Sequence, residues 1–151
     1  MSTALEIEQG MSFARYHDEL LAAAECFCRE TRRNNRPMIE DASVQLRLTR
    51  VAINLGAAQM LHCRTLWNSA ERKANPACGP ASKMFSSEVY KADAVDLLNL
   101  TAPESLACAS AAAAKINLYF RHSQVSTIYG GTSEVLRSMI AEKQLGLPRT
   151  R

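Results

Sequence analysis

The chain has 151 residues, which is the length of a single domain able to bury a sizeable core. Hydrophobic residues make up 47% of it and aromatic residues only 6%, with six glycines and five prolines, a composition that favours helix over sheet. The 18 basic and 15 acidic residues give a net charge of +3 and are spread along the chain, without the dense basic stripe of a nucleic-acid-binding protein. We therefore expect an all-α domain that binds no nucleic acid.

No apolar run approaches the length of a membrane span, and the first residues lack the basic start and apolar centre of a signal peptide. The five cysteines are an odd number, and none forms the Cys-x-x-Cys spacing typical of a zinc site. These features predict a cytoplasmic protein with no metal site and no membrane contact. Its cysteines are interpreted as reduced, ordinary small apolar side chains.

A first helix is predicted up to about Arg33, because apolar residues recur at helical spacing: Phe13, Tyr16, Leu20, Ala24 and Phe27. Residues 32–37 then form a polar link between helices, since Pro37 disfavours helical geometry at Arg36. From the residues alone, this link is interpreted as a solvated turn between helices.

A second helix is predicted from a cap at residues 41–43 to about Lys73, and residues 75–80 form the clearest loop. One side of the helix carries Leu48, Val51, Leu55, Ala58 and Leu66, and the opposite side carries Ile53, Ala57, Met60 and Trp67. A helix that is apolar on two sides is expected to lie between two layers, here its own bundle and a second subunit.

The third and fourth helices are predicted over residues 81–100 and 104–126, separated by a break at residues 101–103. The third places Phe85, Val89, Ala92 and Val95 in the core and Lys83, Glu88, Lys91 and Asp93 in solvent. The fourth places Leu106, Ala109, Ala113, Ile116 and Phe120 on one face. His122 is interpreted as a histidine that interacts favourably with the negative end of the helix dipole. The alternative is that it lies near a bound cofactor.

The segment between the fourth and the last helix contains two adjacent glycines, Gly130 and Gly131. Glycines free the backbone to adopt positive φ and to press N–H groups against a flat or anionic ligand. Thr132 is a predicted N-cap, Glu134 complements the positive end of the helix dipole, and Gly146 ends the helix. Its predicted apolar face carries Val135, Leu136, Met139 and Ile140. The pattern predicts a binding loop for a phosphate, a ribose or a flat ring.

The run Tyr129-Gly-Gly-Thr-Ser-Glu134, followed by Arg137, Ile140-Ala-Glu142 and Leu145-Gly-Leu-Pro-Arg149, resembles the C-terminal signature of the acyl-CoA dehydrogenase family. The resemblance implies an up-and-down bundle of four to five helices and a single domain over residues 1–151. The N-terminal helical domain and the middle β-domain, which the family places upstream, are expected to be missing.

The resemblance also implies contact with FAD. The loop residues that would make it are Tyr129, Gly130, Gly131, Thr132, Ser133 and Glu134. In the family an arginine near the first link binds the flavin pyrophosphate, but Thr31 stands at its position, which leaves Arg32 and Arg33 as displaced candidates. A family Gln-x-x-Gly-Gly element that touches a neighbouring subunit's flavin is absent from residues 99–103.

The family removes an α-proton of the acyl-CoA thioester with a glutamate while the flavin accepts the β-hydride. Its two usual positions for this glutamate hold Gly130 and Arg50 here, and arginine cannot act as a base. Glu40 and Asp41 lie nearby in sequence and are interpreted as helix caps. We therefore expect no catalytic residue and an incomplete enzyme.

In lacking the base, the chain is similar to certain subunits of actinobacterial heteromeric acyl-CoA dehydrogenases. In those enzymes a subunit without the base pairs with one that carries it. The prediction is a flavin-site and oligomerisation module of lipid metabolism, in a homo-oligomer or in a hetero-oligomer with another dehydrogenase subunit. The alternatives are a scaffold or interaction subunit that binds no flavin, and a gene fragment.

Overall fold

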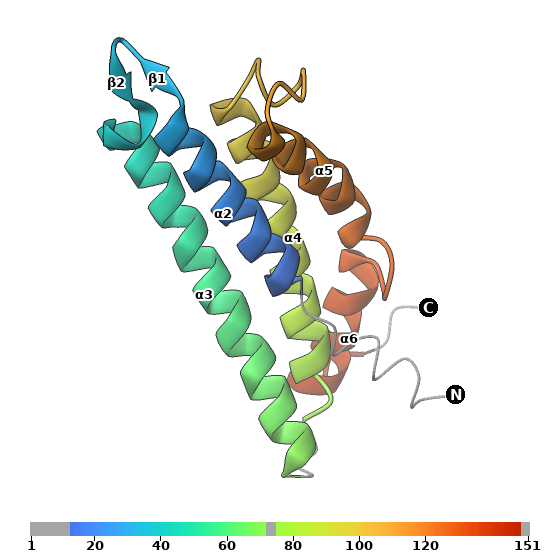
Figure 1. Ribbon diagram of the computed structural model, residues 1–151. Helices are drawn as coiled ribbons and strands as arrows, with labels where there is room; N and C mark the ends of the chain where they lie inside the picture. The colour runs from blue at the N-terminus through green and yellow to red at the C-terminus, as the bar shows by residue number, and fades with distance from the viewer. Residues whose placement is uncertain (1–12, 72–74, 149–151) are drawn as a thin grey trace.

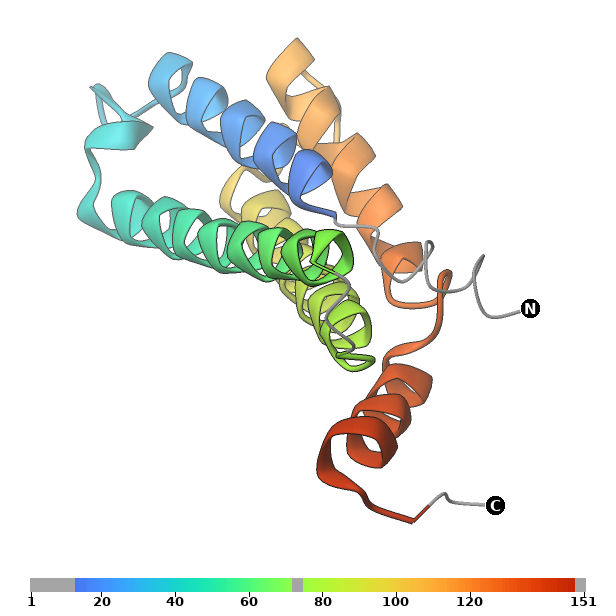
Figure 2. The same cartoon turned by 90° about the horizontal axis from the view of Figure 1, so that it is seen from below.

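The computed structural model describes residues 13–71 and 75–148, which fold into a helical bundle (Figure 1). Its α-helices are α2 (Ala14–Glu30), α3 (Ala42–Ala70), α4 (Cys78–Leu100), α5 (Ala111–Ser126) and α6 (Ser133–Leu145). Helices α2 to α5 pack in the cyclic order α2, α3, α4, α5, with a smaller contact between α2 and α4, while α6 packs mainly on α4. Figure 2 shows α6 set apart from the other four helices. The predicted all-α bundle is confirmed.

The link after α2 is a small β-hairpin. Strand β1 (Arg32–Arg33) pairs antiparallel with β2 (Arg36–Pro37), and the 3-10 turn η1 (Met38–Glu40) follows. Asn34 and Asn35 at the tip have φ values of 51° and 64°. Asparagine tolerates this left-handed region better than most residues, and two such residues in a row form the turn that suits a tight hairpin. The first helix therefore ends at Glu30, before the predicted end.

Helix α3 begins where predicted and ends at Ala70, while its predicted end near Lys73 lies outside the described residues. The Asp41 side chain accepts a hydrogen bond from the backbone N–H of Ser43 at 2.7 Å, which makes Asp41 its N-cap. The stripe that begins at Leu48 faces the core, except that Leu66 is exposed. The opposite stripe faces solvent within the single chain, with Met60 71% exposed.

The buried face of α4 differs from the predicted one. Lys83 and Asp93, expected in solvent, are 1% and 3% exposed, whereas Ala92 and Val95 are exposed. Burial of a charged side chain is tolerable only where other groups satisfy it. Here those groups come from other helices, so apolar periodicity along α4 could not reveal them.

Asp93 joins three helices through buried hydrogen bonds. His17 of α2 lies 2.9 Å from the Asp93 carboxylate through its Nε2 atom, and Asn54 of α3 donates to both carboxylate oxygens at 3.0 and 3.1 Å. The directionality of these bonds fixes how the three helices lie relative to one another.

Helix α5 begins later than predicted. Residues 101–108 form hydrogen-bonded turns, and α5 starts after Ser110, whose hydroxyl accepts the Ala113 N–H at 3.2 Å. The serine cap and a β-region backbone at Ser110 set the start of the helix. Leu106, predicted to lie on its core face, is instead exposed in the preceding turns.

None of the helices in the described ranges is long and apolar enough to cross a membrane. The same residues contain no cluster of three histidine, cysteine or acidic side chains that could hold a metal ion. All five cysteines are free thiols, and burial raises the pKa of Cys28 to about 11.

Candidate functional site

The loop between α5 and α6 has the backbone conformation predicted for it. Gly130 and Gly131 have φ values of 68° and 103°. A Cβ at Gly131 would lie 3.2 Å from the Leu136 side chain, in a backbone region that side chains rarely adopt. Thr132 caps α6, accepting the Val135 N–H at 3.4 Å. The local signals of the sequence are therefore expressed in the structure.

Three consecutive amide N–H groups of this loop remain available. Within the described ranges, the N–H groups of Gly130, Gly131 and Thr132 find no acceptor. The exposed Glu134 carboxylate accepts from its own backbone N–H and from the Thr132 hydroxyl, which lowers its pKa. Its negative charge at the start of α6 favours a neutral hydrogen-bond acceptor over a phosphate at this point.

Four aromatic rings pack beside the loop and belong to Phe13, Tyr90, His122 and Tyr129. The Tyr129 ring packs edge-on against Phe13 with centroids 5.5 Å apart, and its hydroxyl lies 3.3 Å from His122 Nε2. The other ring nitrogen of His122 lies 3.2 Å from the Tyr90 hydroxyl, which itself donates to the Tyr119 carbonyl oxygen at 3.0 Å.

These contacts determine the direction of each hydrogen bond. Because a carbonyl only accepts, the Tyr90 hydroxyl gives its proton to Tyr119 and accepts from His122 Nδ1–H. Neutral Nε2 then accepts from the Tyr129 hydroxyl. Burial lowers the pKa of His122, which favours this neutral form. His122 therefore interacts with two tyrosine hydroxyls and not with the last carbonyls of α5.

Lys83 is the contact of this loop that sequence reasoning missed. Its Nζ donates to the carbonyl oxygens of Ser126 at 2.9 Å and Gly131 at 2.7 Å. The sequence did not reveal this contact, because a lysine at a polar helix position is normally solvated.

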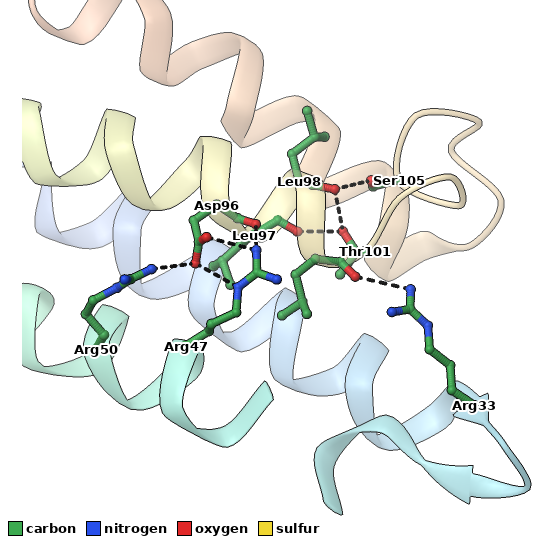
Figure 3. Close-up of polar contacts among 9 residues, drawn as sticks. Arg33, Arg47, Arg50, Asp96, Leu97, Leu98, Thr101 and Ser105 are labelled. Atoms are coloured by element: carbon green, nitrogen blue, oxygen red, sulfur yellow. Dashed lines mark hydrogen bonds and ion pairs between the residues drawn. The ribbon is translucent and has the colours of Figure 1, made fainter. Parts of the chain in front are cut away.

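The predicted arginines lie at the other end of the bundle. Arg32 donates to the Asn35 carbonyl at 3.1 Å, within the hairpin. Arg33 reaches the end of α4 (Figure 3) and donates to the carbonyl oxygens of two residues there, Leu100 at 3.2 Å and Ala102 at 3.4 Å. A cavity of about 530 Å³ lies beside the hairpin, and Arg33, Arg36 and Arg47 are among its lining residues. The structure therefore does not bring the arginines together with the glycine loop.

The second usual position of the family's base is occupied by an ion pair. Arg50 lies 2.9 Å from the Asp96 carboxylate, which also accepts a two-pronged contact from Arg47 at 2.8 and 3.1 Å (Figure 3). Gly130, at the first position, has no side chain. Neither Gly130 nor Arg50 can itself accept a proton.

A sequence model of the family described as acyl-CoA dehydrogenase, C-terminal domain, matches residues 2–145. The chain belongs to the acyl-CoA dehydrogenase family. The match confirms the resemblance carried by the glycine loop and the residues after it. A comparison with curated protein sequences gave no match.

Several solved structures, two of them described as acyl-CoA dehydrogenases, share the fold of this family member. A putative acyl-CoA dehydrogenase from Mycobacterium smegmatis is 23% identical, with a TM-score of 0.85 over 96% of this chain and 38% of that chain. The enzyme from Geobacillus kaustophilus is 20% identical, with a TM-score of 0.81 over 89% of this chain and 34% of that chain. The ChsE4-ChsE5 complex from Mycobacterium tuberculosis is 22% identical, with a TM-score of 0.78 over 91% of this chain and 36% of that chain. This chain thus spans little more than a third of these relatives.

Proposed function

We propose that the chain is a flavin-contacting module of an FAD-dependent acyl-CoA dehydrogenase and that partner chains complete the active site. The observation that carries the proposal is the row of N–H groups at residues 130–132, just before α6, which find no acceptor among the residues that the structure describes. Tyr129, Ser133 and Glu134 flank them. A flat ring with acceptor atoms along its edge fits this row, and the isoalloxazine of FAD is such a ring. When bound, the flavin would supply hydride acceptance.

The separation of the two candidate regions supports an assembly of more than one chain. Lys83 touches the glycine loop and Leu100 touches Arg33, and 17 residues of helix place these points about 25 Å apart. We therefore propose that the glycine loop and the arginine hairpin contact different flavins within an oligomer. The similar structure from Mycobacterium tuberculosis is a complex, ChsE4-ChsE5, which supports pairing with a second chain.

The exposed side of α3 is the proposed contact surface for such a partner. Large apolar side chains recur there every seven residues, and each is more than half exposed: Leu46, Ile53, Met60 and Trp67. Gly56 lies among them, and nothing within 4 Å would meet an added Cβ there, so a neighbouring helix has room to approach. A seven-residue repeat is the spacing by which one helix packs along another.

The catalytic carboxylate would come from the partner. Gly130 cannot provide one, and Arg50 is held in its ion pair with Asp96. The present chain would hold and orient the cofactor, while a glutamate on another chain removes the α-proton of an acyl-CoA thioester.

The alternative is a non-catalytic scaffold that binds no flavin. It is favoured by the internal hydrogen bonds of Arg32 and Arg33, which occupy the groups expected to meet a pyrophosphate. A visible absorption spectrum separates the two functions. The chain is purified alone and after co-expression with a dehydrogenase subunit that contains the N-terminal and middle domains. Flavin in either sample supports the proposal, and a folded complex without flavin supports the scaffold.

The Thr132→Ala variant tests the loop itself. Loss of its hydroxyl removes the α6 cap and should weaken flavin binding, measured by titrating the complex with FAD. Ser138→Ala, an exposed position of the same helix, is the matched control. Equal, measurable affinities in the wild type and Thr132→Ala would remove Thr132 from the site.

A further inference from the structure

We propose that Lys83 is a positioning residue that holds the glycine loop and aims the Thr132 N–H toward the ligand. The relevance of this role to a cofactor rests on the proposed function, whereas the loop geometry does not. Lys83 belongs to α4 and is buried, so its ammonium acts entirely within the protein. Both of its hydrogen-bond acceptors are backbone carbonyls at the two ends of one short segment.

The two bonds close the segment like a clamp. Ser126 is the last residue of α5, and Gly131 is the second of the two glycines. With one nitrogen bound at 2.9 and 2.7 Å, the intervening residues must form a compact loop. Two adjacent glycines with positive φ, neither of which has a side chain to pack, have high backbone freedom when unfolded. A buried cation that binds both ends restricts this freedom.

The bond to Gly131 also determines where the next amide points. The Gly131 carbonyl and the Thr132 N–H belong to one planar trans peptide, in which the two groups point in opposite directions. Because the carbonyl points at Lys83 inside the protein, the N–H points away from it. That N–H is one of the three without an acceptor in the described part of the chain.

The charge strengthens the same peptide as a donor. A hydrogen bond to a carbonyl oxygen polarises the peptide and makes its N–H a better donor, and an ammonium polarises it more than a neutral group. Within the described ranges no carboxylate forms an ion pair with Lys83, the Glu88 carboxylate acts on it only through space, and the Phe13 ring centroid lies 5.9 Å from Nζ. The positive charge therefore acts mainly on the loop.

The test compares Lys83→Met with Lys91→Met. The first substitution keeps much of the side-chain length and removes the charge and the donors, while Lys91 is a partly exposed lysine of the same helix. The carbon-13 shifts of the Ser126 and Gly131 carbonyls are measured in the isolated chain, because they report directly on hydrogen bonds accepted there. We expect upfield changes at these two carbonyls in Lys83→Met and no change in Lys91→Met.

Flavin binding by the co-expressed complex is the second measurement. A lost charge-assisted bond is expected to weaken the affinity by about tenfold in Lys83→Met.

If Lys83→Met does not fold, the wild-type chain is tested for a hydrogen-bond-mediated coupling between Lys83 Nζ and the Gly131 carbonyl carbon. Unchanged carbonyl shifts in a folded variant, or absence of that coupling, would overturn the clamp. A wild-type complex that binds flavin no better than Lys83→Met would overturn the positioning role. If no sample binds flavin, the proposed function fails and the carbonyl shifts still decide the clamp.

Discussion

Replacing Asp93 by alanine should be among the most damaging substitutions in this chain. The change leaves the buried Nε2 of His17 and the partly buried Nδ2 of Asn54 without an acceptor. An orphaned buried donor costs about 1–3 kcal/mol and a partly exposed one costs less, so the two together cost about 2–5 kcal/mol. A domain is typically stable by about 5–15 kcal/mol, so this loss is a large fraction of the total. For a chain of this size, a loss of about 4 kcal/mol lowers the Tm by about 8–16 °C.

Urea unfolding followed by circular dichroism measures this loss in Asp93→Ala. Asp18→Ala is the control, because Asp18 is an exposed acid on α2. A double-mutant cycle that adds Asn54→Ala isolates the contribution of that pair, since residues in direct contact are not additive. If Asp93→Ala were destabilised by less than about 1 kcal/mol, with Asp18→Ala unchanged, the buried network would not carry the helix packing that we assign to it.

Four further predictions have distinct expected outcomes. Ser110→Ala removes the cap of α5 and should cost about 1 kcal/mol in thermal unfolding, and an unchanged Tm would show that other groups satisfy that helix end. Gly131→Ala places a side chain in a strained backbone region and should lower the free energy of unfolding by about 1–3 kcal/mol. It should also remove most of any flavin affinity. A neutral effect would mean that the loop relaxes readily. Burial lowers the pKa of His122 from its ordinary value of 6.5. The contribution of His122 to stability is therefore present above pH 6.5 and is lost as the pH falls through the lowered value. An NMR titration of its ring protons that gave a midpoint above 6.5 would contradict this. Met60→Glu should prevent association through α3, and light scattering that gives the same mass for the wild type and the variant would exclude that surface.

The parts of the fold that could be predicted depend on local chemistry. The caps at Asp41 and Thr132 and the left-handed Gly146 after α6 are each determined by residues within one helical turn. The start of α5 was missed although its signal is also local, because Ser110 is an N-cap residue that precedes an alanine run. Its cap outweighs a helical periodicity that extends further upstream.

The buried face of α4 could not be predicted because its determinants lie far away in the chain. Lys83 finds its acceptors 43 and 48 residues later, and Asp93 finds His17 76 residues earlier. A single sequence gives no sign of such pairings, so charged residues are assigned to solvent by default. For the same reason, the residues that hold the candidate site in place could not be predicted. The loop itself was evident from its glycines, but Lys83 and the Tyr90–His122 contact were not.

The packing of α6 has a consequence for how a ligand would bind. Only Ser133 and Leu136 of this helix are buried, and its packing is mainly against α4. An element with so little buried apolar surface opens locally at a lower free energy than the rest of the bundle. Local opening of α6 would dismantle the glycine loop that precedes it, so the closed site exists only while the helix is docked. Any molecule that binds the loop would then protect α6 from hydrogen exchange and proteolysis, and its measured affinity would include the free energy of docking the helix.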